Sequence, residues 1–285
     1  MIKAIRRNRS LQIASLIFPS AFWLVVFFLA PLGIMLLYSF GRRGTYGGVV
    51  WDWNVQQYLR FVDPLYLQIF FRSVWIAVLT TVICLVVGYP FAFFIARQPA
   101  RRRSPLLLLV MIPFWTNFLI RTYAWILILR TEGLVNTVLL SLGLISQPLT
   151  LLYTSGAVIL GLVYGYLPFM VLPLYASIEK FDFSLVEAAF DLGANEVRAF
   201  LRVVLPQTMP GVIAGCILVF IPSIGAFVTP DILGGAKTVM IGNLVQQQFL
   251  TSRDWPFGSA VSFILMLIVT LAIVVYFRTT EEELR

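Results

Sequence analysis

Long apolar runs alternate with short charged segments along this chain. Six uncharged stretches are long enough to cross roughly 30 Å of hydrocarbon as helices. The helices expected in them cover about residues 13–40, 73–96, 104–125, 153–178, 208–230 and 256–277. The pattern predicts an all-α, polytopic membrane protein with six transmembrane helices, forming a single domain over residues 1–285.

The stretch between Glu132 and Glu179 is too long for one helix. Its first part, residues 134–150, is short and is interrupted by polar residues and glycine at positions 136, 143 and 147. We expect this segment to be a re-entrant or interfacial element, so that only the second part of the stretch crosses the membrane.

Composition supports the membrane assignment. Hydrophobic residues make up 60% of the chain and charged residues only 12%, against about 25% in soluble domains. Cys84 and Cys216 both fall inside expected spans, without metal-ligand spacing, and are expected to be buried free thiols.

Basic residues set the expected orientation. They gather before the first span and after the second, the same side on which the loop after the fourth span falls: Lys3, Arg6, Arg7, Arg9, Arg97, Arg101, Arg102 and Arg103. Short loops rich in Lys and Arg stay in the cytoplasm, so both termini are expected there. The net charge of +8 then reflects topology and contact with anionic membrane lipid rather than nucleic-acid binding.

Several kinds of chemistry are excluded by the sequence. The chain contains no histidine and no G-x-x-x-x-G-K-[ST] phosphate-binding loop. We therefore expect no catalytic residue, no metal site and no cofactor bound by this chain. Any step that needs energy must therefore be driven by a partner or by an ion gradient.

The most polar segment is a loop over about residues 179–206. Ser184 and Glu187 have the spacing of a capping box that would begin a short helix, and Gly193 can take the left-handed conformation that ends it. A second helix is expected from Glu196 until Pro206 stops it. A helical projection of this kind suits docking to a soluble partner; an amphipathic interfacial helix is the alternative.

This loop resembles the EAA loop of the permease subunits of bacterial ABC importers. The family pattern is E-A-A, three residues, G, nine residues, I, one residue, L-P, and the chain departs from it only in having Val203 at the isoleucine position. The resemblance implies a type I importer permease fold, in which this loop couples to a cytoplasmic ATPase. The coupling residues it implies are Ser184, Glu187, Ala188, Ala189, Asp191, Gly193, Leu205 and Pro206.

Segments outside the loop are similar to permeases of spermidine/putrescine importers, B-type subunit. They include Gly88-Tyr89-Pro90-Phe91-Ala92, Ile112-Pro113-Phe114-Trp115-Thr116-Asn117 and Asp254-Trp255-Pro256-Phe257-Gly258. The resemblance implies half of a polyamine translocation path in the bacterial inner membrane. The implied partners are two ATPase subunits that bind ATP and Mg, a C-type permease and an extracytoplasmic solute-binding protein. Permeases for opines, iron and other amines share much of the pattern, so another solute is the alternative within this family. Outside the family, the alternative is an ion-coupled carrier or a channel.

A polycation that leaves water needs carboxylates or aromatic faces in place of its hydration. The candidate path residues are Asp231, Trp115, Asn117, Tyr123, Tyr166 and Phe169. Asp231 is expected at the outer end of the fifth span, with Arg121 as its ion-pair partner if its role is structural. Packing, or anchoring at the membrane interface, is the alternative role for the aromatic residues.

Overall fold

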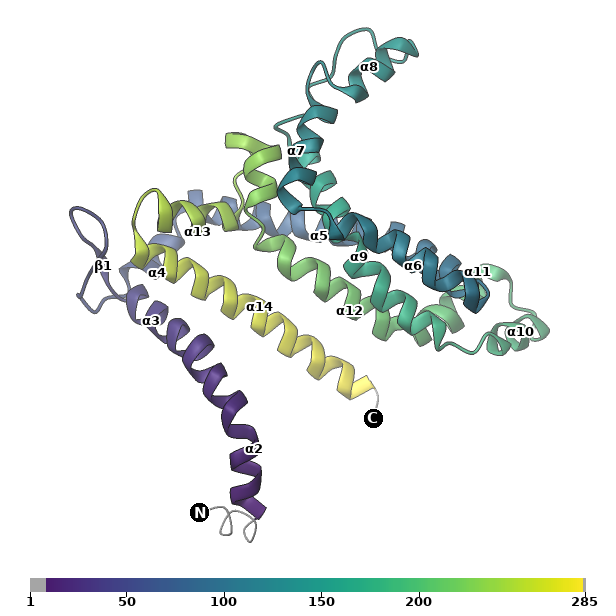
Figure 1. Cartoon of the computed structure of the whole chain (residues 1–285), viewed down its shortest axis with the longest axis horizontal. Coiled ribbons are helices and arrows are strands. Elements are labelled where there is room, and N and C mark those ends of the chain that lie inside the picture. The colour runs from purple at the N-terminus through teal and green to yellow at the C-terminus, as the bar shows by residue number, and fades with distance from the viewer. Residues whose placement is uncertain (1–8, 284–285) are drawn as a thin grey trace. The chain divides into compact units, whose positions relative to one another are not determined.

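The computed structural model describes residues 9–283, and the described chain is mainly helical (Figure 1). Contacts between residues divide the chain into two compact units. One contains Met1–Tyr66 and Val245–Arg285, and the other contains Leu67–Leu244. The single domain expected over residues 1–285 stays a prediction. Of the basic residues used for orientation, Lys3, Arg6 and Arg7 lie outside the described residues.

The first unit begins with a long helix and continues into a short hairpin. The helix runs through α2 (Arg9–Leu24), the π-helical turn η1 (Val25–Leu29) and α3 (Ala30–Ser39). Strands β1 (Arg42–Arg43) and β2 (Val49–Val50) then pair antiparallel, with Arg42 opposite Val50. The unit is completed by α4 (Gln56–Phe61) and, at the other end of the chain, α14 (Trp255–Glu283).

The second unit holds most of the remaining helices. In chain order they are α5 (Pro64–Ala96), α6 (Ala100–Trp115), α7 (Phe118–Leu129), α8 (Leu134–Ser141), α9 (Ser155–Glu179), α10 (Ser184–Asp191), α11 (Glu196–Ala199), η2 (Phe200–Val204), α12 (Leu205–Ile224), η3 (Pro230–Gly234) and η4 (Gly235–Lys237). Helix α13 (Ile241–Leu250) leads from this unit into the first.

Helices α5, α9 and α12 form the centre of the second unit. Cys84 of α5, Met170 of α9 and Val219 of α12 are fully buried in one apolar cluster. Helices α9 and α12 approach closely at Gly215, where an added Cβ would lie 2.6 Å from the sulfur of Met170. Small residues at such crossings let membrane helices pack tightly.

Six stretches among the described residues are long and apolar enough to cross a membrane: Leu16–Ser39, Pro64–Ala96, Phe118–Ser141, Ser155–Glu179, Glu196–Ile224 and Trp255–Val274. The number agrees with the six spans expected. The third differs, because the expected span 104–125 is interrupted: α6 ends at Trp115, the backbone is extended at Thr116 and Asn117, and α7 begins at Phe118. The segment expected to be re-entrant contains α8.

Candidate functional site

The polar loop forms two short helices separated by a tight turn. Gly193 makes the turn with φ +81°, the left-handed conformation that the sequence predicts. Asn195 then begins α11, because its Oδ1 accepts a hydrogen bond from the Arg198 amide at 2.8 Å. This helix–turn–helix lies at the end of α9, as Figure 1 shows.

The capping box expected at Ser184 and Glu187 is wrong. Ser184 is the first helical residue, and the cap comes from Asp182, whose Oδ1 accepts the Ser184 amide at 3.0 Å. That hydrogen bond lowers the pKa of the Asp182 carboxyl group, which therefore stays ionised and suits the positive end of α10. Asp182 also precedes the helix by two residues, the spacing of an Asx-turn, and this was the signal in the sequence.

The surface of α10 is available to a partner. Glu187, Ala188, Asp191 and Gly193 are exposed, and Leu192 is 89% exposed. Ala189 faces inward and is buried. The small buried alanine lets α10 lie close to the rest of the unit, while its acidic and apolar side chains point outward.

Pro206 does not stop the second helix, contrary to the prediction. The helix continues from Glu196 to Ile224, and the turn just before the proline, η2, is π-helical. A proline ring normally clashes with the carbonyl four residues earlier, and a widened turn relieves that clash. Leu205 is partly buried and Pro206 exposed. The polar loop is therefore continuous with the fifth span.

A groove of about 490 Å³ lies beside α10. Its polar rim consists of Arg97, Glu187 and Glu196. The guanidinium carbon of Arg97 lies 5.7 Å from the ring centroids of Phe93 and Phe183. The charged rim and aromatic wall suit a cationic or amphipathic side chain of a partner. Sequence reasoning used Arg97 only for orientation. Phe93, four residues earlier in the last turn of α5, was the available signal.

The candidate path residues occupy two regions of the second unit. Trp115, Asn117 and Tyr123 flank the break between α6 and α7, and all three are exposed. Tyr166 and Phe169 lie on α9, where their ring centroids are 6.3 Å apart, and the Tyr166 hydroxyl donates to the Pro222 carbonyl at 3.3 Å.

Asp231 is displaced from its expected place at the end of the fifth span. Helix α12 ends at Ile224, and Asp231 lies in the separate π-helical turn η3, where it is exposed. Gly225, which follows α12, interrupts the run that the sequence suggested was continuous. The expected pair with Arg121 is absent among residues 9–283: Arg121 donates instead to the carbonyl of Pro113.

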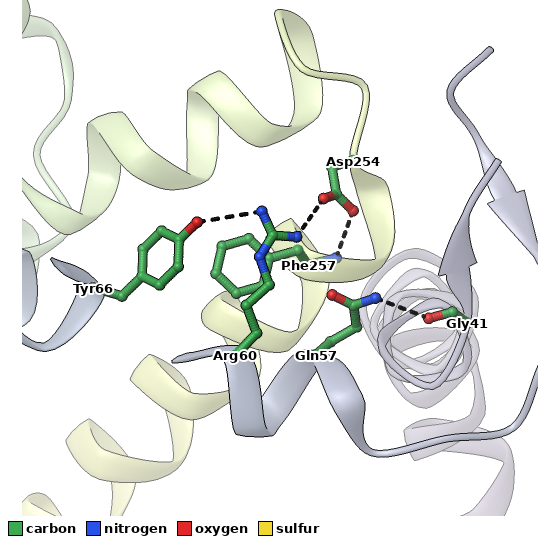
Figure 2. A network of polar contacts seen from close by, with 6 residues as sticks. All are labelled: Gly41, Gln57, Arg60, Tyr66, Asp254 and Phe257. Atoms are coloured by element: carbon green, nitrogen blue, oxygen red, sulfur yellow. Dashed lines mark hydrogen bonds and ion pairs between the residues drawn. The ribbon is translucent and has the colours of Figure 1, made fainter. Parts of the chain in front are cut away.

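A polar network in the first unit was not foreseen (Figure 2). Arg60 of α4 contacts Asp254, just before α14, at 2.7 Å and donates to the Tyr66 hydroxyl at 3.3 Å. Its guanidinium carbon lies 4.1 Å from the ring centroid of Phe257, and Asp254 also accepts the Phe257 amide at 3.3 Å. Burial disfavours the charged guanidinium and by itself lowers the pKa of Arg60. The hydrogen bonds to Asp254 and Tyr66 outweigh this effect, so the pKa of Arg60 is raised.

One amide of this network is only half satisfied. Gln57 donates to the carbonyl of Gly41 at 3.4 Å, while its buried Oε1 has no hydrogen-bond partner within the described part of the chain.

The residues Arg60 and Asp254 are far apart in the sequence, so no local pattern could have paired them.

The geometry therefore comprises an exposed helical knob, a bundle of apolar helices and no cluster of His, Cys, Asp or Glu suited to a metal within residues 9–283. Residues 88–280 match the family described as "Binding-protein-dependent transport system inner membrane component". The chain belongs to this family. It is thus a multi-pass inner-membrane subunit of a transport system.

Members of this transport family resemble the chain over most of its length. The "Spermidine/putrescine transport system permease protein PotB" of Escherichia coli K12 is 47% identical over 259 residues, covering 91% of this chain and 94% of the relative. The protein of the same name from Haemophilus influenzae is also 47% identical, with 91% of each chain covered.

A solved structure shows the same fold. A chain of a bacterial ABC transporter involved in the import of the acidic polysaccharide alginate superposes with a TM-score of 0.72 at 17% identity, covering 97% of this chain and 98% of that one. The type I ABC importer permease fold expected from the coupling loop is confirmed.

Proposed function

We propose that this chain forms half of the translocation path of an ATP-driven importer for polyamines. The observation that carries the proposal is the 47% identity to spermidine/putrescine permeases over nine-tenths of the chain. This similarity covers 91% of the chain at 47% identity, whereas the likeness to the alginate transporter concerns the fold alone. An opine, another amine or ferric iron is the alternative solute.

The partners follow from this role. Two ATPase subunits hydrolyse ATP, a related C-type permease supplies the other half of the path, and a solute-binding protein delivers the solute outside. The chain itself binds no cofactor and catalyses no reaction. Exposure of Glu187, Ala188, Asp191 and Leu192 on α10 supports docking of this helix in a groove of the ATPase. Gly193 sets the angle between α10 and α11.

The same proposal fixes the orientation. Arg97 and Arg103 flank the loop between α5 and α6, and this loop belongs with the Glu187 knob on the cytoplasmic side. Both termini are then cytoplasmic, and Asp231 lies toward the outside. A carboxylate there is suited to receive a polycation from the binding protein, since it is exposed and has no ion-pair partner among the described residues.

The decisive experiment reconstitutes the complete complex in proteoliposomes and measures ATP-dependent uptake and solute-stimulated ATPase activity. We expect stimulation by spermidine or putrescine delivered by the binding protein, and none by opines or ferric iron. A non-hydrolysable ATP analogue is the control for energy coupling. Stimulation by an opine or by iron alone would replace the polyamine assignment, and uptake that persists without ATP hydrolysis would exclude the importer mechanism.

A further inference from the structure

The break between α6 and α7 lies far along α6 from the basic cluster that marks one membrane surface in the proposed orientation. Helix α6 starts beside the basic cluster at Arg103 and packs along α9, and Thr116 is about 20 Å farther along its axis at 1.5 Å per residue. The hydrocarbon core is about 30 Å thick. Thr116 (φ −71°, ψ 149°) and Asn117 (φ −57°, ψ 128°) are extended, and α7 leaves in a different direction (Figure 1).

Extended backbone at this depth must not face lipid. The last carbonyl groups of α6 lose their helical partners at the break, and an unsatisfied carbonyl in hydrocarbon costs several kcal/mol. Irregular backbone inside membranes is found where it is buried in protein or lines a water-filled cavity. Trp115 is 69% exposed and Thr116 and Asn117 are exposed, so the described chain does not cover the break. By the same argument the break faces water or a partner rather than lipid.

Arg121 has folded back onto this break. Its Nη1 donates to the carbonyl of Pro113, which also accepts the Thr116 hydroxyl at 2.7 Å. The guanidinium carbon lies 5.6 Å from the ring centroids of both Phe118 and Tyr164. A positive charge therefore occupies the carbonyl end of α6, where the helix dipole is negative.

All the groups that hold this guanidinium are neutral. Within residues 9–283 Arg121 makes no ion pair, although a permanent structural charge inside a membrane protein usually has a charged partner. A backbone carbonyl and two aromatic faces are also good ligands for an ammonium group. A solute ammonium can take the place of Arg121 without leaving a buried carboxylate unpaired.

We propose that the α6–α7 break is an ammonium-binding site on the solute path, which Arg121 occupies in this conformation and vacates for the solute. The site rests on the proposed polyamine function and adds a mechanism to it. Arg121 acts as a tethered competitor, which keeps the carbonyl site satisfied when it is empty of solute and weakens solute binding enough to permit release.

The first test compares Arg121→Gln with Arg121→Lys in the reconstituted complex. The glutamine variant loses the competing charge, so we expect the KM for spermidine to fall about fivefold while the maximal rate also falls, because the solute leaves more slowly. Arg121→Lys should restore most of the original KM. Arg130→Gln, which removes a charge from the end of the same helix away from the break, is the matched control and should leave KM unchanged.

An unchanged or raised KM in Arg121→Gln, with the complex intact, overturns the proposal. So does loss of complex assembly in Arg121→Gln that Arg121→Lys repairs without any difference in KM, because Arg121 would then only be a structural pin.

The second test does not depend on Arg121. In a chain lacking Cys84 and Cys216, Thr116→Cys should react with a water-soluble methanethiosulfonate, and spermidine should protect it. Leu108→Cys, on a 50% exposed position of the same helix, should stay unreactive in lipid. An unreactive Thr116→Cys overturns the water-lined site. If the unmodified complex imports no polyamine, the proposed function fails by itself, and labelling without solute still tests the break.

Discussion

Arg103 Nη1 lies 2.9 Å from Glu179 Oε1, so the first turn of α6 is tied to the last residue of α9. Arg103 also donates to the Gln98 carbonyl at 2.7 Å through Nε. The polar loop leaves α9 directly after this ion pair. The pair therefore fixes the point from which the α10 knob projects.

Reversing one charge of this pair should destabilise the subunit modestly. The two side chains are 30% and 40% exposed, so their interaction contributes at most about 1 kcal/mol. We expect Arg103→Glu or Glu179→Arg to lower the melting temperature of the purified complex by about 2–4 °C, and the double variant to recover most of the loss. Arg102→Glu, at an exposed neighbouring position, is the control; an equal loss there would show that total charge matters and the pair does not.

Docking of α10 should be sensitive to charge and to backbone conformation. Glu187→Lys reverses the charge of the exposed face, and Gly193→Val forces a β-branched residue to φ +81°. Both should abolish uptake at unchanged membrane expression. Gly143→Val is the matched control for strain, since Gly143 has φ +66° and, like Gly193, open space around it, but follows α8 away from the loop. Normal uptake in both loop variants would remove the coupling assignment.

Asp231 should contribute to solute entry rather than to assembly. Asp231→Asn keeps the size of the side chain and removes its charge, and the structure gives the carboxylate no ion pair to lose in residues 9–283. We expect polyamine uptake to fall about tenfold, as for loss of one charge-assisted contact, with normal recovery of the complex. Uptake equal to that of the unmodified chain would exclude Asp231 from the path.

The Arg60–Asp254 contact should stabilise the first unit strongly. The Asp254 side chain is only 4% exposed, so Arg60→Met leaves an almost buried carboxylate unpaired, at a cost of about 3–5 kcal/mol. Asp254→Asn should cost less, because the amide can still cap the Phe257 backbone and Arg60 can turn to water. Thermal unfolding of the two single variants and the double variant measures the coupling. Melting temperatures of all three variants equal to that of the unmodified chain would show that the pair contributes nothing.

The orientation can be tested by labelling in a chain without its two native cysteines. Tyr46→Cys, at a 97% exposed position in the hairpin, and Gln247→Cys should react with an impermeant maleimide from outside intact cells. Ala100→Cys should react only after permeabilisation. Labelling of Ala100→Cys from outside would invert the proposed topology.

The apolar runs predicted where helices form more reliably than where they end. Five of the six candidate spans overlap most of an expected span, because twenty apolar residues have few alternatives to a helix in lipid. The break at Thr116 was missed because the run from Arg103 to Arg121 carries no charged residue between its ends. Yet Asn117 followed by apolar residues is a cap signal, and its Oδ1 does accept the Leu119 amide at 2.9 Å.

The two wrong predictions in the polar loop, the helix stop at Pro206 and the cap at Ser184, have local causes. Proline ends helices of regular pitch, but the π-helical turn before Pro206 has a different pitch, and π-helical turns have no simple sequence signature. Ser184 and Glu187 do have the spacing of a capping box. The backbone N–H of Ser184, which Glu187 would accept in such a box, is bound by Asp182 instead. Contacts such as Arg60 with Asp254 depend on the folded chain and have no local pattern at all.

The uninterrupted helix from Glu196 to Ile224 gives the subunit a lever. It is about 43 Å long, so a tilt of one degree at its α11 end moves the other end by about 0.8 Å. The helix continues through the π-helical turn η2 and through Pro206, Pro210 and Pro222 to Gly225, where it ends and the chain turns toward η3. A small rotation imposed at α11 is therefore delivered, enlarged, next to the turn that carries Asp231.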